Sequence, residues 1–442
     1  MKIMLISLGC DKNLSDSEKV LGSLVKHNHE ITDDPEEAEA IVINSCCFIH
    51  DAKQESIETI LEAAEYKNKG KLRCLIVTGC LATRYCDEIL AEIPEVDCVL
   101  SASAIDEVLN VIDGFVKNGC IEKKIIKDVN HDAELGGDRV FSSPKSHAYL
   151  KIAEGCDKRC TYCVIPSIKG KYRSRRFEDI VEEAKLLAEN GKNEILIIAQ
   201  ETSRYGIDLY GEKRLGELLR AVSEIEGIEW IRVLYCYPEE IDDSLIQAMK
   251  NIDKVCKYID MPIQHASDTV LRRMGRRTNK KEITSLIAKL RKEIPGIAIR
   301  TSLITGFPGE TEEEHEELAE FIRKMKLDRV GVFTYSREEN TPAAAMKGQI
   351  RKNIKEKRRK ELMLLQQEVV FEKNRKLVGK CEKVIIEGKL PDENIYIGRT
   401  YRDAPDIDGY CFVESDRDIL SGSIINCRIT AAKEYDLIAK EI

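Results

Sequence analysis

Three cysteines on one short segment constrain this chain more than any other feature of its sequence. Cys156, Cys160 and Cys163, the central triad, follow one another with the spacing Cys-x3-Cys-x2-Cys. Three thiolates on one loop can ligate three irons of a four-iron, four-sulfur cubane, and the missing fourth ligand leaves one iron open. A closed electron-transfer cluster or a structural zinc site would need a fourth ligand, and the next cysteine, Cys236, lies far outside the loop. Zinc or three unrelated buried thiols are the alternatives, and the compact spacing favours the cluster.

The size and composition of the chain indicate its number of domains and the use of its cysteines. At 442 residues the chain is longer than one hydrophobic core supports, so two or three domains are expected. No apolar run approaches the roughly 20 residues of a membrane helix, and the N-terminal run lacks a signal-peptide cleavage pattern. We therefore expect a soluble, cytoplasmic protein without a membrane partner. Its 16 cysteines favour metal ligation or catalysis over disulfides, because the cytosol keeps thiols reduced.

The N-terminal part of the chain alternates short apolar runs with helical patterns, as a parallel α/β sheet does. We predict strands at 2–8, 40–43 and 74–77 and a helix at 53–66. These elements would form a parallel α/β sandwich over residues 1–120. A charged stretch that contains Gly136, Gly137 and Pro144 predicts a linker over 121–146.

The alternation resumes in a central domain that we predict to span residues 147–374. Its strands are expected at 194–199, 230–235, 258–263, 297–303 and 330–335, with helices at 177–189 and 312–326. Repeated strand and helix pairs of this kind predict a barrel or a partial barrel, so the fold class is α/β. A stretch at 351–375 without Pro or Gly predicts one long closing helix.

The C-terminal part of the chain has a different pattern. Short β-like runs are separated by turn residues over 375–442, namely Gly388, Pro391, Gly398, Gly409 and Gly422. This pattern predicts a small antiparallel β-barrel.

A second set of cysteines follows the three predicted strands of the N-terminal domain. Cys10, Cys46 and Cys80, the N-terminal triad, each come just after one of these strands, and two of them have a glycine before them. The carboxyl ends of parallel strands meet at one edge of a sheet, so the three thiols are expected to converge. Single buried cysteines often act as small hydrophobes, but three such placements favour a second three-cysteine cluster. The other cysteines show no comparable arrangement and are predicted to be structural.

These features together resemble a known family. The spacing of the central triad, with Tyr162 before its last cysteine, is that of the radical S-adenosylmethionine superfamily. The two triads in this order resemble the methylthiotransferase family over nearly the whole chain, which implies a methylthiotransferase N-terminal domain, a radical S-adenosylmethionine core with a partial TIM barrel, and a TRAM barrel. Segments resembling the ribosomal-protein branch rather than the tRNA branch lie at 7–14, 16–18, 149–152, 331–339 and 402–409.

The resemblance implies a transferase that adds a methylthio group to the β-carbon of an aspartate in a small-subunit ribosomal protein. It implies two four-iron, four-sulfur clusters, one on each triad, together with S-adenosylmethionine and an external electron donor. One S-adenosylmethionine would methylate a sulfur at the N-terminal triad, and a second would be cleaved at the central triad to a deoxyadenosyl radical. Because an unactivated C–H bond has no acidic proton, a radical route suits this reaction, and no side chain is assigned as a catalytic acid or base.

Two positions depart from the family's usual pattern. Asp11 stands where Pro is usual, and Cys47 stands where Gly is usual. Cys47 adjoins Cys46, so either thiol could ligate the cluster, and the position after the predicted strand favours Cys46.

Polar residues after two predicted barrel strands are candidate contacts for S-adenosylmethionine. Gln200, Glu201 and Thr202 follow one strand and Gln264 follows another, at the end where a barrel places its ligand loops. Tyr162 joins them as a cofactor-binding candidate by resemblance. The alternative is ordinary polarity at strand ends, and the sequence leaves both interpretations open.

Three further features have weaker signals. His265 is either a proton donor or a structural histidine, and we favour the structural role. The turn at 306–310 resembles one that borders the adenine in this superfamily, although a Gly-Pro turn alone is only a turn. The basic run at 169–176 either contacts an acidic group of substrate or cofactor or is a solvated loop.

Charge separates the main hypothesis from its nearest rival, a tRNA adenosine methylthiotransferase. The net charge is −9, and residues 375–442 carry 11 Lys and Arg against 13 Asp and Glu, whereas an RNA-binding barrel should be basic. The charge thus argues against direct RNA binding and for a basic ribosomal protein as partner. A second rival, from another class, is an iron–sulfur electron-transfer protein without chemistry of its own.

Overall fold

The computed structural model describes residues 1–135, 137–142, 146–391 and 393–442. The chain divides into two compact units. The first unit comprises Met1–Ser142, Glu154–Arg173 and Ser336–Thr341. The second unit comprises the strand that begins at His147, Ser174–Tyr335 and Pro342–Ile442.

The first unit is built on a parallel six-stranded sheet of order β2-β1-β3-β4-β5-β6. Its strands are β1 (Lys2–Ser7), β2 (Glu30–Ile31), β3 (Ala40–Ser45), β4 (Cys74–Gly79), β5 (Cys98–Leu100) and β6 (Lys124–Ile125). The central strands β3 and β4 are buried along their whole length, as parallel strands covered on both faces are. The three strands predicted in this region are confirmed.

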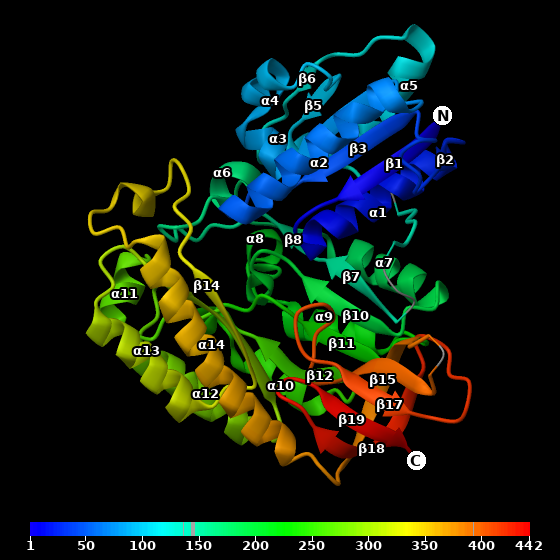
Figure 1. Ribbon diagram of the computed structural model, residues 1–442. Helices are drawn as coiled ribbons and strands as arrows, with labels where there is room; N and C mark the ends of the chain where they lie inside the picture. The colour runs from blue at the N-terminus through cyan, green and yellow to red at the C-terminus, as the bar shows by residue number, and fades with distance from the viewer. Residues whose placement is uncertain (136, 143–145, 392) are drawn as a thin grey trace. The chain divides into compact units, whose positions relative to one another are not determined.

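Helices cover both faces of this sheet, because alternate side chains of each strand enter two different cores. One core takes Ile41, Ile43, Leu75 and Val77 from the strands, and the other takes Ala40, Val42 and Ile76. The first core is closed by α2 (His50–Lys69), α3 (Cys80–Arg84) and α4 (Cys86–Glu92), and the second by α1 (Asp11–Lys26) and α5 (Val108–Asn118), which follows the 3-10 helix η1 (Ala102–Glu107). In Figure 1, α2 runs across the face of the first sheet.

The stretch predicted as a linker is partly structured. It contains β6, an edge strand of the first sheet. This strand was not predicted, because a strand of two residues is too short to show an alternating pattern. Further along, Arg139 Nε donates to Glu18 Oε2 at 2.7 Å, and Val140 N donates to Glu18 O at 3.0 Å, so this part of the chain packs on α1. Gly136 and Pro144 lie outside the described residues.

The second unit contains a parallel six-stranded sheet of order β14-β13-β12-β11-β10-β7. Its strands are β7 (His147–Lys151), β10 (Glu194–Ile198), β11 (Trp230–Val233), β12 (Val255–Asp260), β13 (Ala298–Thr305) and β14 (Arg329–Thr334). Every strand is thus the neighbour of the next strand along the chain, apart from the short β8 (Ala153–Glu154) and β9 (Arg173–Ser174). The partial barrel and its five predicted strands are confirmed, and β7 was missed.

Helices connect successive strands of this sheet. They are α7 (Phe177–Glu189), α9 (Leu215–Ser223), α10 (Asp243–Asn251), α12 (Lys280–Glu293) and α13 (Glu312–Met325), and the long α14 (Lys352–Arg375) packs on β14 and α13. Short helices occupy the loops, namely α6 (Ile165–Lys169), η2 (Thr202–Arg204), α8 (Ile207–Tyr210), η3 (Pro238–Glu240), α11 (Asp268–Arg273) and η4 (Pro342–Ala345). Across the described part of the chain, no helix combines the length and apolar character needed to cross a membrane.

The C-terminal barrel has five strands in the closed order β15-β16-β17-β19-β18. They are β15 (Cys381–Lys389), β16 (Ile395–Thr400), β17 (Cys411–Glu414), β18 (Ile424–Ala432) and β19 (Leu437–Glu441). Four neighbouring pairs are antiparallel, as predicted, and β17 pairs with β19 in parallel. One parallel pair is required, because strands that alternate in direction cannot close a ring with an odd number of members.

Candidate functional site

The N-terminal triad lies at the carboxyl edge of the first sheet. Cys10 follows β1, Cys46 follows β3, and Cys80 begins α3 directly after β4. These three strands are neighbours, and their register places Ser7, Asn44 and Thr78 side by side. Cys46 and Cys80 are buried and Cys10 is exposed. The structure therefore brings together the three cysteines that the sequence singled out.

Two glycines allow the strand ends to approach each other closely. Gly9 has φ +89°, and a Cβ at this position would lie 2.5 Å from Cys46 Cβ and 2.6 Å from Cys46 Sγ. Gly79 has φ +94°, and a Cβ there would lie 2.4 Å from Ser45 O. Both positions therefore require glycine for its positive φ and for its lack of a side chain.

Gly9→Ala is expected to displace the Cys46 thiol and to lower iron binding at the N-terminal triad. The left-handed backbone alone costs an alanine about 1–2 kcal/mol, and the clash with Cys46 adds to this. Iron content after anaerobic reconstitution and the free energy of unfolding of the apo-protein measure the two effects. The matched control is Gly114→Ala on α5, where a Cβ meets nothing within 4 Å and stability should rise by about 0.5–1 kcal/mol. Equal iron content in the two variants would contradict the expectation.

The structure distinguishes Cys46 from its neighbour Cys47. Ser56 Oγ accepts from Cys46 N at 2.9 Å and donates to Cys46 O at 2.8 Å, which fixes the Cys46 backbone beside Gly9. Cys47 is fully buried in the core under α2, and Arg84 NH1 donates to its carbonyl at 3.3 Å and lies 3.9 Å from its Sγ. Burial raises the pKa of Cys46 to about 11, so a metal ion that bound this thiol would have to displace a proton.

The central triad lies on the loop between β8 and α6. Cys156 N donates to Gly170 O at 3.1 Å, and Cys163 N donates to Cys160 O at 3.1 Å. Ile165 N donates to Cys163 Sγ at 3.5 Å, the kind of N–H contact to sulfur that tunes iron–sulfur clusters. These hydrogen bonds thus fix the backbone of the loop that carries the three cysteines.

Both triads belong to the first unit, which the sequence did not indicate. Val164 and Ile168, from the segment after the central triad, enter the same hydrophobic core as Cys47 and Cys80. The buried Lys169 lies at the end of this segment, with Nζ 3.5 Å from Glu154 Oε2. Burial lowers the pKa of Lys169, and the charges of Glu154, Cys80, Asp16 and Cys10 raise it above its ordinary value. A buried cation near the N-terminal triad offsets the negative charge of thiolate ligands.

Among the described residues, no three His, Cys, Asp or Glu side chains gather tightly enough to hold one metal ion. A cavity of about 340 Å³ reaches Cys163, and its lining includes Arg84, Tyr85, Ser167 and Asn340.

The loop Ser336–Thr341, which follows β14, packs within the first unit. Glu338 is only 3% exposed and lies 3.3 Å from Arg84 NH1, and Tyr85 Oη donates to Glu339 Oε2 at 3.1 Å. Arg84 thus joins this loop to the Cys47 backbone. Arg84 and Glu338 were not predicted from the sequence. The resemblance over 331–339 is a signal that could have found Glu338, and the sequence offers no such signal for Arg84.

The candidate cofactor contacts of the second unit lie at the carboxyl ends of β10 and β12. Glu201 Oε1 accepts from Ser203 N at 3.2 Å and from Tyr237 N at 3.3 Å, so this carboxylate shapes its own loop. Thr202 Oγ1 is buried and has no hydrogen-bond partner among the described residues, which leaves a group for a ligand to satisfy. Gln264 has φ +73°, a strained conformation of the kind found at ligand sites. Gln264 and the Gln200–Thr202 group follow strands separated by β11. Tyr162 is partly buried in the first unit.

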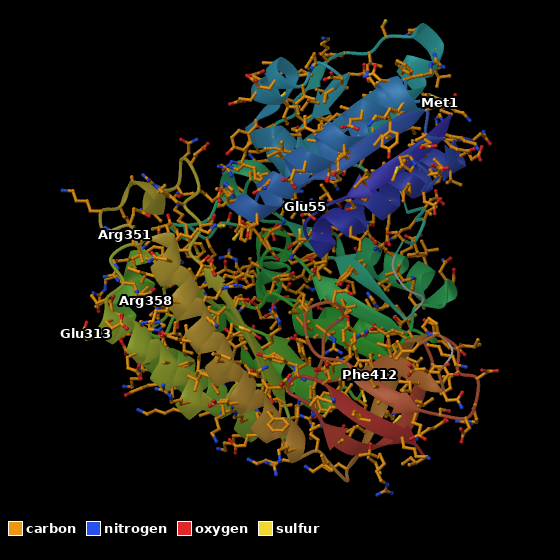
Figure 2. All side chains as sticks on the ribbon, in the orientation of Figure 1. Met1, Glu55, Glu313, Arg351, Arg358 and Phe412 are labelled. Atoms are coloured by element: carbon orange, nitrogen blue, oxygen red, sulfur yellow. The ribbon has the colours of Figure 1, made fainter. Side chains whose placement is uncertain are left out.

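The surroundings of His265 are those expected of a structural histidine, the role that we favoured. It is fully buried, its Nδ1 accepts from Ser267 N at 2.9 Å, and burial lowers its pKa to about 3, so the ring is neutral. Its Nε2 lies 3.8 Å from Glu310 Oε2, beyond hydrogen-bond distance, and Glu310 accepts from Arg358 NH1 at 2.9 Å. Arg358, labelled in Figure 2, comes from α14, so the turn at 306–310 is braced by this helix.

The basic run at 169–176 is largely engaged within the chain. Besides Lys169, Arg173 Nε donates to Asp132 Oδ1 at 2.5 Å, and Arg175 NH1 lies 2.7 Å from Glu183 Oε2. Lys171 and Arg176 are exposed.

A partial (β/α) barrel, a Cys-x3-Cys-x2-Cys loop and a second cysteine triad on a parallel sheet define a radical S-adenosylmethionine protein with an additional domain. Family models match three successive parts of the chain. They are Uncharacterized protein family UPF0004 over residues 2–101, the Radical SAM superfamily over 150–322 and the TRAM domain over 378–442.

Curated relatives cover the whole chain. The ribosomal protein uS12 methylthiotransferase RimO of Lachnoclostridium phytofermentans is 59% identical over 438 residues, which are 99% of each chain. The protein of the same name from Acetivibrio thermocellus is 51% identical over 446 residues, which are 100% of this chain and 98% of the relative. The chain belongs to the family of ribosomal protein uS12 methylthiotransferases, and it is a radical S-adenosylmethionine methylthiotransferase.

Solved structures share the fold at low identity. The radical S-adenosylmethionine methyltransferase TsrM of Kitasatospora setae is 15% identical with a TM-score of 0.57, and 75% of this chain and 72% of that chain are covered. The cobalamin-dependent radical enzyme OxsB is 12% identical with a TM-score of 0.53, and 82% and 56% are covered. These similarities concern the fold alone.

Proposed function

We propose that this chain transfers a methylthio group to the β-carbon of an aspartate in ribosomal protein uS12, in the cytoplasm and with an external electron donor. The observation that carries the proposal is the presence of two separate cysteine triads in one compact unit, in a chain 59% identical to a uS12 methylthiotransferase. The central triad would hold the cluster that starts the radical reaction, and the N-terminal triad would hold the cluster that carries the transferred sulfur.

The residues of the two triads fit two four-iron, four-sulfur clusters. We assign Cys156, Cys160 and Cys163 to the cluster with the open iron, and the N-terminal triad to the other. Three thiolates, no fourth ligand in the loop and an N–H donor to Cys163 Sγ support the first assignment. When bound, the clusters and S-adenosylmethionine supply the radical chemistry and the methylthio group.

The chain's own residues position these groups. Gly9 and Gly79 let three strand ends meet, and Ser56 fixes the backbone of Cys46. Lys169 supplies a buried positive charge near Cys80 and Cys10. In the second unit, Gln200, Glu201, Thr202 and Gln264 are our candidates for holding S-adenosylmethionine, and Tyr162 is the candidate from the cluster loop.

The test is mass spectrometry of ribosomal proteins and tRNA from a strain that lacks the gene. We expect uS12 to lose one methylthio group on one aspartate and to regain it when the gene is restored. A strain restored with Cys160→Ala should remain unmodified. Loss of a methylthio group from tRNA adenosine with uS12 unchanged would establish the rival substrate instead.

Anaerobic reconstitution separates the proposal from a simple electron-transfer protein. About eight irons per chain and release of deoxyadenosine on reduction are expected. Four irons, or eight irons without cleavage of S-adenosylmethionine, would contradict the assignment of two clusters with one open iron.

A further inference from the structure

Part of the loop between β16 and β17 of the C-terminal barrel is buried. Asp403 and Ala404 are buried, and Asp408 has a side chain that is 2% exposed. This loop contains the segment 402–409, for which the sequence suggested no role beyond resemblance. The β16–β17 loop is therefore partly buried within the second unit, while Asp406 and Ile407 are exposed.

Four strands of the partial barrel hold the β16–β17 loop. Arg232 of β11 donates through NH1 to Tyr401 O at 2.7 Å. Tyr258 of β12 donates to Asp408 Oδ2 at 2.7 Å, and Arg300 Nε of β13 lies 3.5 Å from Asp408 Oδ1. Arg329 of β14 pairs with Asp403. In Figure 1 the C-terminal barrel lies beside this sheet, which agrees with these contacts.

A chain of polar contacts continues from Asp408 across the sheet. Arg300, which faces Asp408, donates through NH1 to Asp260 Oδ1 at 2.8 Å. Asp260 is the last residue of β12, and its other oxygen, Oδ2, accepts from Tyr235 N at 3.1 Å. Tyr235 O in turn accepts from Thr202 N at 2.9 Å. The contacts thus run from the C-terminal barrel to the loop that carries Gln200, Glu201 and Thr202.

Tyr235 is the strained member of this chain. Its φ is +62°, and a left-handed conformation costs a residue other than glycine about 1–2 kcal/mol. Such a conformation persists where surrounding contacts impose it. The Asp260 carboxylate accepts the Tyr235 N–H, and Cys236 N also donates to Asp260 O at 2.9 Å, so β12 fixes the backbone on both sides of the strained peptide.

We propose that Asp260 and Asp408 are positioning residues for the S-adenosylmethionine site, and that the β16–β17 loop braces that site from within the second unit. Asp408 orients Arg300, Arg300 orients Asp260, and Asp260 holds Tyr235, whose carbonyl fixes Thr202. The inference rests on the proposed function in so far as Gln200–Thr202 contact the cofactor. It assigns the TRAM loop a role inside the enzyme rather than on an RNA.

The test compares Asp260→Asn, Asp408→Asn and Asp408→Glu in the full-length, reconstituted protein. Glu414→Gln is the matched control, because Glu414 lies on the same barrel, is 61% exposed and contacts only Lys440 among the described residues. Equilibrium dialysis of S-adenosylmethionine gives the dissociation constant, and hydrogen exchange of the apo-protein follows the amide of Thr202. The KM for S-adenosylmethionine and the kcat for deoxyadenosine release are measured without protein substrate.

We expect Asp260→Asn to weaken cofactor binding about tenfold, the range in which supporting residues of a site act, with iron content unchanged. Asp408→Asn should weaken binding several-fold and speed exchange at Thr202. Asp408→Glu should lose less than Asp408→Asn because it keeps the charge, and Glu414→Gln should stay close to the unmodified chain. KM should rise with little change in kcat.

Unchanged cofactor affinity and Thr202 exchange in Asp408→Asn would overturn the inference, and they would do so even if Asp260→Asn fails to fold. A result of this kind leaves the proposed function intact, because the unmodified chain still binds and cleaves S-adenosylmethionine. An unmodified, reconstituted chain that binds no S-adenosylmethionine would overturn the proposed function and the inference together.

Discussion

Cys46→Ala is expected to reduce the iron bound after reconstitution from about eight to about four per chain and to abolish methylthio transfer. Cys47→Ala should leave both nearly unchanged. The reason is geometric: Cys46 Sγ lies against Gly9 beside Cys10, whereas Cys47 is buried under α2 with Arg84 at its carbonyl. Iron analysis, the electron paramagnetic resonance spectrum of the reduced protein and mass spectrometry of uS12 measure the outcome.

Cleavage of S-adenosylmethionine gives this prediction an internal control. The central triad is intact in Cys46→Ala, so reductive release of deoxyadenosine should continue while the product is absent. Full iron content in Cys46→Ala together with a loss of four irons in Cys47→Ala would show that the neighbouring thiol is the ligand.

Glu194→Gln is expected to cause a large loss of stability. Glu194 begins β10 and is completely buried, and its oxygens lie 2.7 Å from Arg232 Nε and 2.6 Å from Arg399 NH2. A neutral side chain would leave two buried guanidinium groups with one charge fewer to compensate them. Breaking such a buried pair costs about 3–5 kcal/mol.

Trp230 provides the measurement, because it is the one tryptophan of the chain and pairs with Glu194 across β10 and β11. Its fluorescence in a denaturant titration reports the unfolding of this sheet. The control is Glu293→Gln, whose exposed pair with Lys250 at 3.0 Å should contribute little to stability. A Glu194→Gln variant as stable as this control would contradict the prediction.

The same carboxylate predicts how stability depends on pH. Burial raises the pKa of Glu194, but Arg399 and Arg232 lower it to about 2, below the ordinary value of 4.5. A group whose pKa is lower in the folded state stabilises the fold fully above its ordinary pKa. This contribution should therefore be lost between about pH 4.5 and pH 2, and Glu194→Gln should flatten that part of the stability profile.

The sequence determined the local elements of this protein and the spacing of its cysteines. The runs that predicted β1, β3, β4 and β10–β14 are confirmed, because alternation and apolar length are local properties of the chain. The short strands β5 and β6 were missed, because two or three residues contain no period. The spacing of the central triad and the position of the N-terminal triad after three strands are also local properties of the chain, so both could be predicted from the sequence. That these cysteines ligate clusters stays a prediction.

Tertiary structure alone decided which distant segments pack together. It placed the loop of the central triad and Ser336–Thr341 in the first unit, and it turned Cys46 toward Gly9 and Cys47 toward Arg84. It also buried Asp408 and Glu194 against arginines of other strands. In the sequence these acids look like ordinary solvated charges, because their partners are tens to hundreds of residues away, and only a folded chain removes both members of such a pair from water.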